Sequence, residues 1–197
     1  MNMNSEPDPE QANPSKNEEE EVLTLLHIAA LKGRKEVAAF LIAHGQDVNA
    51  LTNKGFTPLH SASINGHKDV AQLLLENGAK PNTKKNLGGV PLLYAAMKDH
   101  VGIAKVLLKH GAALEIVDNS GGTPLHFAAS SGSVQVVKLL LANGANVHAK
   151  DNDGKTPLDV ATAEAADLLR HYHTKHGKST APLSPGSPRW KGTASNN

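Results

Sequence analysis

Hydrophobic residues along this chain follow a helical spacing that starts afresh every 33 residues. Within the stretch 53–85, Val70, Leu73 and Leu74 stand at positions i, i+3 and i+4. That spacing places them on one face of a helix, so it predicts an amphipathic helix over about residues 68–77. Polar residues fill the opposite face of the same helix.

A shorter helix is predicted before it, over residues 59–65. Thr57 is a residue type that caps helix N-termini well, and Pro58 is tolerated in the first turn because that position needs no N–H. Gly66 lets the chain reverse between the two helices, and Gly78 suits the left-handed end of the second. Each unit is therefore predicted to be an antiparallel helix pair followed by an extended loop.

The same punctuation returns along the chain. The Thr-Pro-Leu-His block at 57–60 recurs at 123–126, with variants at 24–27, 90–93 and 156–159. The glycine that ends the second helix recurs as Gly45, Gly78, Gly111 and Gly144. A fixed period of this length indicates one supersecondary unit stacked on copies of itself, so the predicted fold class is an all-α solenoid.

These motifs resemble those of the ankyrin-repeat family over residues 22–172. The matching residues are the Thr-Pro-Leu-His blocks, Gly66-His67, and the Leu-Leu-Leu-x-x-Gly-Ala runs that begin at Leu73 and Leu139. The resemblance implies five stacked helix pairs, with finger loops beside a concave groove, and a function in binding other proteins. The first and fifth units depart from the motif and are expected to be caps.

The third unit departs from the pattern inside the array. Val90 replaces the capping threonine, Leu93 replaces the histidine, and Asp99 replaces the glycine between the helices. We expect a weaker cap and a weaker turn here, which predicts the least stable internal unit.

Charge is unevenly spread, although the net charge is only +1. Residues 1–21 carry a net charge of −6, residues 22–172 carry +3, and residues 173–197 carry +4. Both ends are polar and proline-broken, so they are predicted to be a disordered acidic tail and a disordered basic, Ser/Pro-rich tail. Ser184 and Ser187 precede prolines and match proline-directed kinase sites, a pattern that disordered tails often contain by chance. A central charge of +3 does not indicate nucleic-acid binding.

Composition restricts the environment and the chemistry. The chain has no cysteine, no basic stretch followed by an apolar leader, and no apolar run of membrane-spanning length. We therefore expect a cytoplasmic or nuclear protein without a membrane segment, monomeric by default. No phosphate loop or nucleophile elbow is present, so no catalytic residue or cofactor is expected.

Histidine is the one residue type that invites a catalytic or metal-binding interpretation. His27, His60 and His126 fall at the motif position, where the resemblance implies bonds to the threonine hydroxyl or to the loop backbone. His171, His173 and His176 cluster irregularly, but the sequence shows no fourth ligand for a zinc site. We expect no metal site, and an enzyme is the weakest hypothesis.

The resemblance implies that a partner binds at positions that the fold leaves free, the finger tips and the ends of the first helices. The candidates are Leu31, Lys32, Lys54, Phe56, Ile64, Asn65, Leu87, Met97 and Lys98. Apolar groups beside lysines predict a partner protein with an apolar segment and an acidic flank. Two interpretations stay open for the apolar residues at the helix ends: they contact a partner, or they pack against adjacent units.

The role of such a partner also stays open. An adaptor or scaffold and a stoichiometric inhibitor of an enzyme or transcription factor would use the same surface. The resemblance further implies asparagine hydroxylation at Asn49 and Asn82, which end finger segments.

Overall fold

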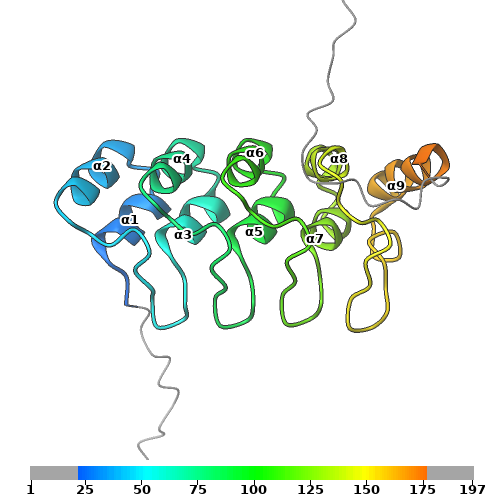
Figure 1. Cartoon of the computed structure of the whole chain (residues 1–197), viewed down its shortest axis with the longest axis horizontal. Coiled ribbons are helices and arrows are strands. Elements are labelled where there is room, and N and C mark those ends of the chain that lie inside the picture. The colour runs from blue at the N-terminus through cyan, green and yellow to red at the C-terminus, as the bar shows by residue number, and fades with distance from the viewer. Residues whose placement is uncertain (1–21, 177–197) are drawn as a thin grey trace, which may run out of the picture.

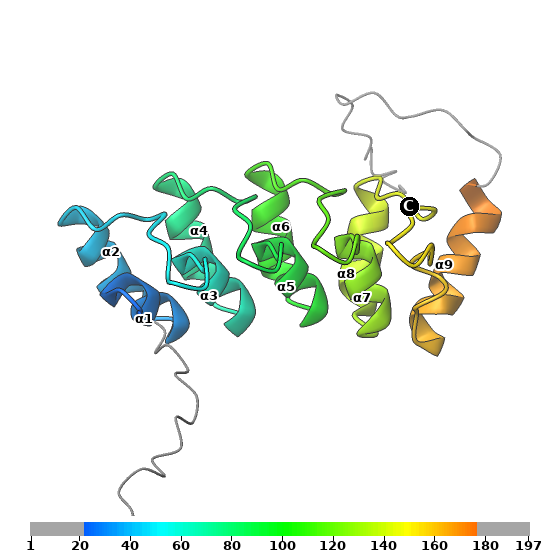
Figure 2. The ribbon, with the colours of Figure 1, turned by 90° about the horizontal axis from the view of Figure 1, so that it is seen from below.

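The computed structural model describes residues 22–176, and all regular structure in that range is helical. The helices are α1 Leu25–Leu31, α2 Lys35–Ala43, α3 Pro58–Asn65, α4 Lys68–Glu76, α5 Pro91–Met97, α6 Val101–Lys109, α7 Pro124–Ser130, α8 Val134–Ala142 and α9 Ala163–His176. Helices α1, α3, α5 and α7 form an inner row beside the finger loops, and α2, α4, α6 and α8 form an outer row (Figures 1 and 2). The predicted all-α solenoid is confirmed. Within the described range no helix is both long and apolar enough to span a membrane.

Helix boundaries follow the predicted punctuation closely. In the second unit, α3 begins at Pro58 behind its cap Thr57, and α4 ends at Glu76 with Asn77 as the C-cap residue. The fifth unit is shorter, because residues 157–160 form turns in place of a first helix. Its helix α9 runs to His176, past residue 172, where the repeat region was expected to end. The predicted disordered tails, residues 1–21 and 173–197, lie outside the described residues except for 173–176, which belong to α9.

The threonine and histidine of the motif cap each inner helix together. In α3 the Thr57 hydroxyl oxygen accepts a bond from the His60 backbone N–H, and the His60 Nδ1 accepts one from the Thr57 N–H at 3.1 Å. The same reciprocal pair caps α1 through Thr24 and α7 through Thr123. Each pair satisfies two backbone donors that a helix start otherwise leaves unpaired.

The same histidines join consecutive units. Because Nδ1 accepts a backbone hydrogen bond, the proton sits on Nε2, which donates to a carbonyl oxygen in the next unit. His27 Nε2 reaches Phe56 O at 3.0 Å, His60 Nε2 reaches Gly89 O at 3.2 Å, and His126 Nε2 reaches Lys155 O at 3.0 Å. The third unit has Leu93 at this position and lacks both the side-chain cap and this link. The predicted weakening of its cap is confirmed, while its rank in stability stays a prediction.

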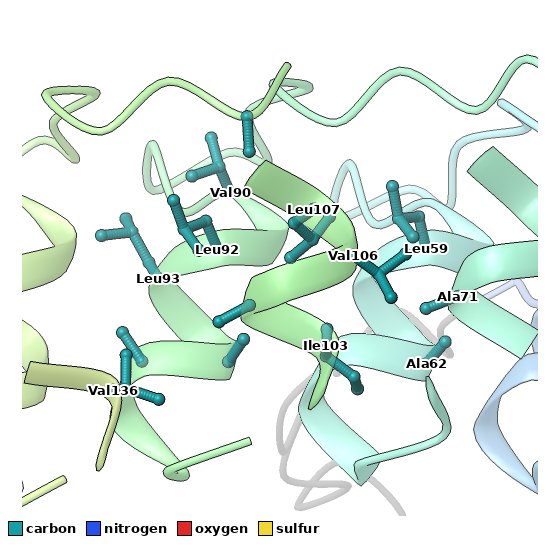
Figure 3. Close-up of a cluster of buried hydrophobic side chains, with 14 of the residues drawn as sticks. Leu59, Ala62, Ala71, Val90, Leu92, Leu93, Ile103, Val106, Leu107 and Val136 are labelled. Atoms are coloured by element: carbon teal, nitrogen blue, oxygen red, sulfur yellow. The ribbon is translucent and has the colours of Figure 1, made fainter. Parts of the chain in front are cut away.

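The core is a continuous aliphatic layer between the two rows of helices. Figure 3 shows its central part, where Leu107 of α6 is drawn between Leu92 of α5 and Leu59 of α3. These three leucines are fully buried. Alanines such as Ala62 and Ala96 fill the remaining positions and let neighbouring helices approach closely. Each unit therefore depends on the units beside it for burial of its apolar face.

The turn between inner and outer helices is built by a residue pair from two units. His67 packs its ring over Gly33 of the preceding unit, where an added Cβ would lie only 2.5 Å from the imidazole Nδ1. Its Nε2 donates to Leu31 O at 3.0 Å, and His100 makes the corresponding bond to Ile64 O. Two features therefore require glycine at this position: the backbone has a positive φ, and the His67 ring leaves no space for a Cβ.

The third and fourth units replace this pair as a whole. Asp99 stands at the glycine position with φ +53°, and Ser133 replaces the histidine that would cover it. The Asp99 carboxylate accepts a hydrogen bond from the Val136 N–H at 2.9 Å in the first turn of α8. A bond to a charged acceptor offsets the cost of the left-handed backbone. The turn expected to be weak thus gains a link to the next unit.

This exchange predicts strong coupling between the two positions. Gly33→Asp alone should destabilise the protein by about 1–3 kcal/mol, because the new side chain collides with the His67 ring in a left-handed backbone. Combining it with His67→Ser should recover at least about 1 kcal/mol relative to additivity. Urea unfolding of the two single variants and the double variant measures the coupling. Strictly additive losses would show that the two residues are not a functional pair.

Candidate functional site

Most exposed large apolar side chains of the described structure gather at two places, and Leu51 and Val117 lie outside both. One is the outer face of the first unit, where Leu25, Val37 and Phe40 are exposed. No other unit packs on that face in the described structure, so the repeat pattern itself accounts for their exposure. The other place lies in the middle of the array, where Leu87 is 67% and Met97 is 38% exposed although units flank them on both sides. The fold does not account for this second exposure.

Leu87 and Met97 line a hollow of about 160 Å³ on the finger side of the array. Its other lining residues are Lys85, Gly89, Leu93, Tyr94, Asp118 and Phe127, and the whole set is called the inner hollow below. Helix α5 supplies one wall, the finger before it supplies a second, and Phe127 of α7 completes it. The surface is mostly apolar with one cation and one carboxylate, a composition typical of a binding site.

Departures from the repeat pattern build this hollow. Leu93 occupies the position where three other units have the capping and linking histidine and the fifth unit has Asp159, and it is buried at the floor. Tyr94 packs over Gly89, where a Cβ would lie 2.7 Å from its hydroxyl, and Phe127 packs over Gly122 in the same register. Each glycine gives room to an aromatic ring five residues later.

The second unit places its ring differently. There Phe56 occupies the glycine position and small Ser61 occupies the ring position. The Phe56 and Tyr94 ring centroids lie 6.3 Å apart. One ring in each of three consecutive units therefore faces the finger side, which uses three of the chain's six aromatic residues.

The two charged residues of the inner hollow differ in what they are free to bind. The Asp118 carboxylate already accepts bonds from the Ser120 N–H, the Ser120 hydroxyl and the Gly122 N–H at 2.6–3.0 Å. The Lys85 ammonium lies 4.8 Å from the Phe56 ring centroid and 5.8 Å from that of Tyr94. These contacts hold the Lys85 ammonium over the aromatic rings. The inner hollow thus offers a positive charge at its edge, whereas its carboxylate is used within its own finger.

The structure brings together only part of the predicted binding set. Leu87 and Met97 line the inner hollow. Phe56 is not in the lining, but its ring lies under the ammonium of Lys85, which is. Leu31 and Ile64 are half-buried and lie outside the lining.

The polar members of that set lie apart from the inner hollow. Lys32, Lys54 and Lys98 are exposed but do not line it. The Asn65 side chain donates to Ser61 O at 2.8 Å in the last turn of its own helix. Sequence reasoning missed Leu93, Tyr94 and Phe127, although the paired exchange of glycine and aromatic positions was a signal for the two rings.

The predicted modification sites have structural roles where they are described. Asn49 donates to Gly78 O at 3.1 Å and accepts from the Lys80 N–H at 2.9 Å, which joins two fingers. Asn82 repeats both bonds with the next finger, to Gly111 O and from the Ala113 N–H. Hydroxylation at these asparagines stays a prediction. Ser184 and Ser187 lie outside the described residues.

The histidines give no sign of a metal site where they are described. Among residues 22–172 no group of three or more potential ligand side chains is arranged to hold a metal ion. Buried His60 is held by Thr57 and Gly89, and burial lowers its pKa to about 4. The side chains of His173 and His176 lie outside the described part.

Geometry and sequence now agree on the class of protein: a solenoid of helix pairs with finger loops beside its inner helices. A family model described as "Ankyrin repeats (3 copies)" matches residues 5–85 and 92–178. The chain belongs to the ankyrin-repeat family. Repeats of this family are generally protein–protein interaction modules and are typically not enzymes. No curated protein matches the sequence.

Proposed function

We propose that this protein is an adaptor or scaffold that holds a partner protein through the inner hollow. The partner segment inserts one or two large apolar side chains between Leu87, Tyr94 and Met97. An acidic residue beside them pairs with Lys85. The observation that carries this proposal is the concentration of pattern-breaking residues around one exposed apolar hollow in the middle of the array.

Replacement of the capping pair in the third unit supports the same assignment. Val90 and Leu93 forgo the reciprocal cap and the link to the fourth unit, which are present at α3 and α7. A cap of this kind stabilises a helix by about 1 kcal/mol. Residues that break a local rule at the cost of stability are expected where function requires them. Here the apolar Leu93 side chain forms part of the floor.

Selection from a displayed peptide library on the immobilised protein tests this proposal. We expect enriched peptides to share large apolar residues next to Asp or Glu. Leu87→Glu/Met97→Glu should weaken binding of those peptides by about a hundredfold, because the carboxylates must be desolvated beside the ligand's own acid. Leu51→Glu is the matched control, since Leu51 is also an exposed finger leucine but lies outside the inner hollow.

A second variant separates binding from folding. Val90→Thr/Leu93→His restores the capping pair of the other units, so it should fold at least as stably as the parent chain. It should nevertheless lose peptide binding, because an imidazole replaces the apolar floor. Peptides without a shared motif, or binding unchanged in both double variants, would contradict the proposal.

A further inference from the structure

A second hollow lies on the opposite side of the array from the fingers, between the outer helices α4 and α6. These two helices lie side by side in both ribbon views (Figures 1 and 2). The hollow has a volume of about 360 Å³ and is called the outer hollow below. Its lining includes Lys68, Gln72, Gly102, Lys105, Lys109 and His110.

The outer hollow concentrates positive charge without a balancing carboxylate. No acidic residue lines it. In residues 22–172 ion pairs are formed by Lys155 with Asp153 and by Arg170 with Asp167, both remote from α4 and α6 in the sequence. On α4 itself, the Glu76 carboxylate accepts a bond from the Gln72 amide at 2.8 Å. Three lysines that line one concave surface create a local potential that attracts anions.

Comparison of the units shows that only the third one contributes this glycine and this lysine to the surface. The position of Gly102 is occupied by Glu36, Asp69 and Gln135 in the other units. The position of Lys109 is occupied by Ala43, Glu76 and Ala142. Helix α6 thus has glycine and lysine where α4 has two acids, and it contains no acidic residue at all.

Gly102 also provides the space. A Cβ added at Gly102 would lie 3.1 Å from the Lys68 Cδ, so the aliphatic part of Lys68 crosses the helix at the missing side chain. Glycine inside a helix costs about 1 kcal/mol relative to alanine. In the third unit this glycine leaves space for a cavity and removes the negative charge that Glu36 and Asp69 carry at the same position.

We infer that the outer hollow binds a compact ligand that carries two or more phosphate groups. Lysine ammonium groups recognise phosphate oxygens as point charges, and the three lysines line the same cavity from two helices. The volume falls in the range of small-ligand sites, about 300–1,000 Å³. His110 lines the outer hollow beside the lysines. Its Nδ1 donates to Val106 O at 3.0 Å, so Nε2 is the ring nitrogen that this bond does not use.

A nucleic acid fits this surface less well than a compact ligand. Its evenly spaced phosphates require basic residues along a track. On the neighbouring outer helices, Lys35 is followed by Glu36 on α2, and α8 carries only Lys138. The charge is therefore local to the outer hollow, on the side of the array away from the inner hollow.

Calorimetric titration of the full chain with inositol hexakisphosphate tests the inference. Lys105→Ala/Lys109→Ala should weaken binding by at least about tenfold. The control Lys35→Ala/Lys138→Ala removes the same charge from α2 and α8 and should change affinity by less than about twofold. Gly102→Gln keeps the charge and copies the fourth unit, so it should fold well yet also lose about tenfold by filling the cavity.

Co-sedimentation with phosphatidylcholine vesicles containing phosphatidylinositol bisphosphate identifies the source of the phosphate. If the protein is retained on these vesicles and the variants lose that retention, the ligand is a lipid headgroup. If the protein binds inositol hexakisphosphate but not the vesicles, the ligand is a free metabolite. Equal losses in the control and the lysine variants would show unspecific charge attraction and overturn the inference. Absence of binding to both probes would overturn it as well.

Discussion

Replacing Leu107 with alanine is expected to lower the free energy of unfolding by about 2–5 kcal/mol. Leu107 is fully buried on α6, in the aliphatic layer that Figure 3 shows between the two rows of helices. Removing three carbons there leaves a cavity that neighbouring helices fill poorly, since both are held in register by the next units. The urea midpoint of unfolding, followed by circular dichroism, measures the loss.

The position of Leu107 in the array adds a second readout. Each unit is stabilised by its neighbours, so a defect in the third unit should uncouple the units on either side. We expect the transition to broaden and its denaturant slope to fall, in addition to the lower midpoint. Leu87→Ala is the matched control, a leucine removed from the finger before α5. Because Leu87 is exposed, the free energy of unfolding of this variant should stay within about 0.5 kcal/mol of that of the parent chain. An unchanged midpoint for Leu107→Ala would show that this helix face is wrongly assigned.

Much of the fold could be predicted from the sequence because its signals are local and repeated. Thr57, Pro58 and Gly66 each specify a backbone conformation within a few residues, and the 33-residue period confirms each assignment elsewhere in the chain. The caps, the turns and the apolar faces of the outer helices were therefore predicted at the positions where the structure has them. The end of α9 was not, because nothing in its last turn marks a stop before His176.

Contacts between units were harder to predict, since the hydrogen bonds that link them join residues 29 or more positions apart. Asp99 looked like a weakened turn when considered alone, and its bond to the Val136 N–H becomes visible only in the stacked structure. The candidate site shows the same limit. Exposed Leu87 and Met97 could be identified one unit at a time, whereas the floor formed by Leu93 and Phe127 requires two adjacent units.

Lowering the pH from 6.5 to about 4 is expected to destabilise the protein by about 3 kcal/mol through His60 alone. Burial lowers the pKa of His60 from its ordinary 6.5 to about 4, with a smaller contribution in the same direction from the charge of Lys85. The backbone bond to Gly89 acts in the opposite direction without cancelling the effect of burial. In this pH window the unfolded chain binds a proton that the folded chain does not. The contribution of neutral His60 to stability is therefore fully present above pH 6.5 and is lost as the pH falls toward 4.

Urea unfolding at intervals across this window isolates the contribution of His60. His60→Gln keeps a hydrogen-bonding side chain but removes the titration, so its stability should fall less steeply with decreasing pH than that of the parent chain. His44→Gln removes an exposed histidine at the end of α2 and should leave the slope close to that of the parent. Protonation of Nδ1 removes the acceptor of the Thr57 N–H and so breaks the cap of α3, whereas Nε2 can still donate to Gly89 O. Parallel pH profiles for His60→Gln and the parent chain would show that His60 is not the group that makes the array sensitive to acid.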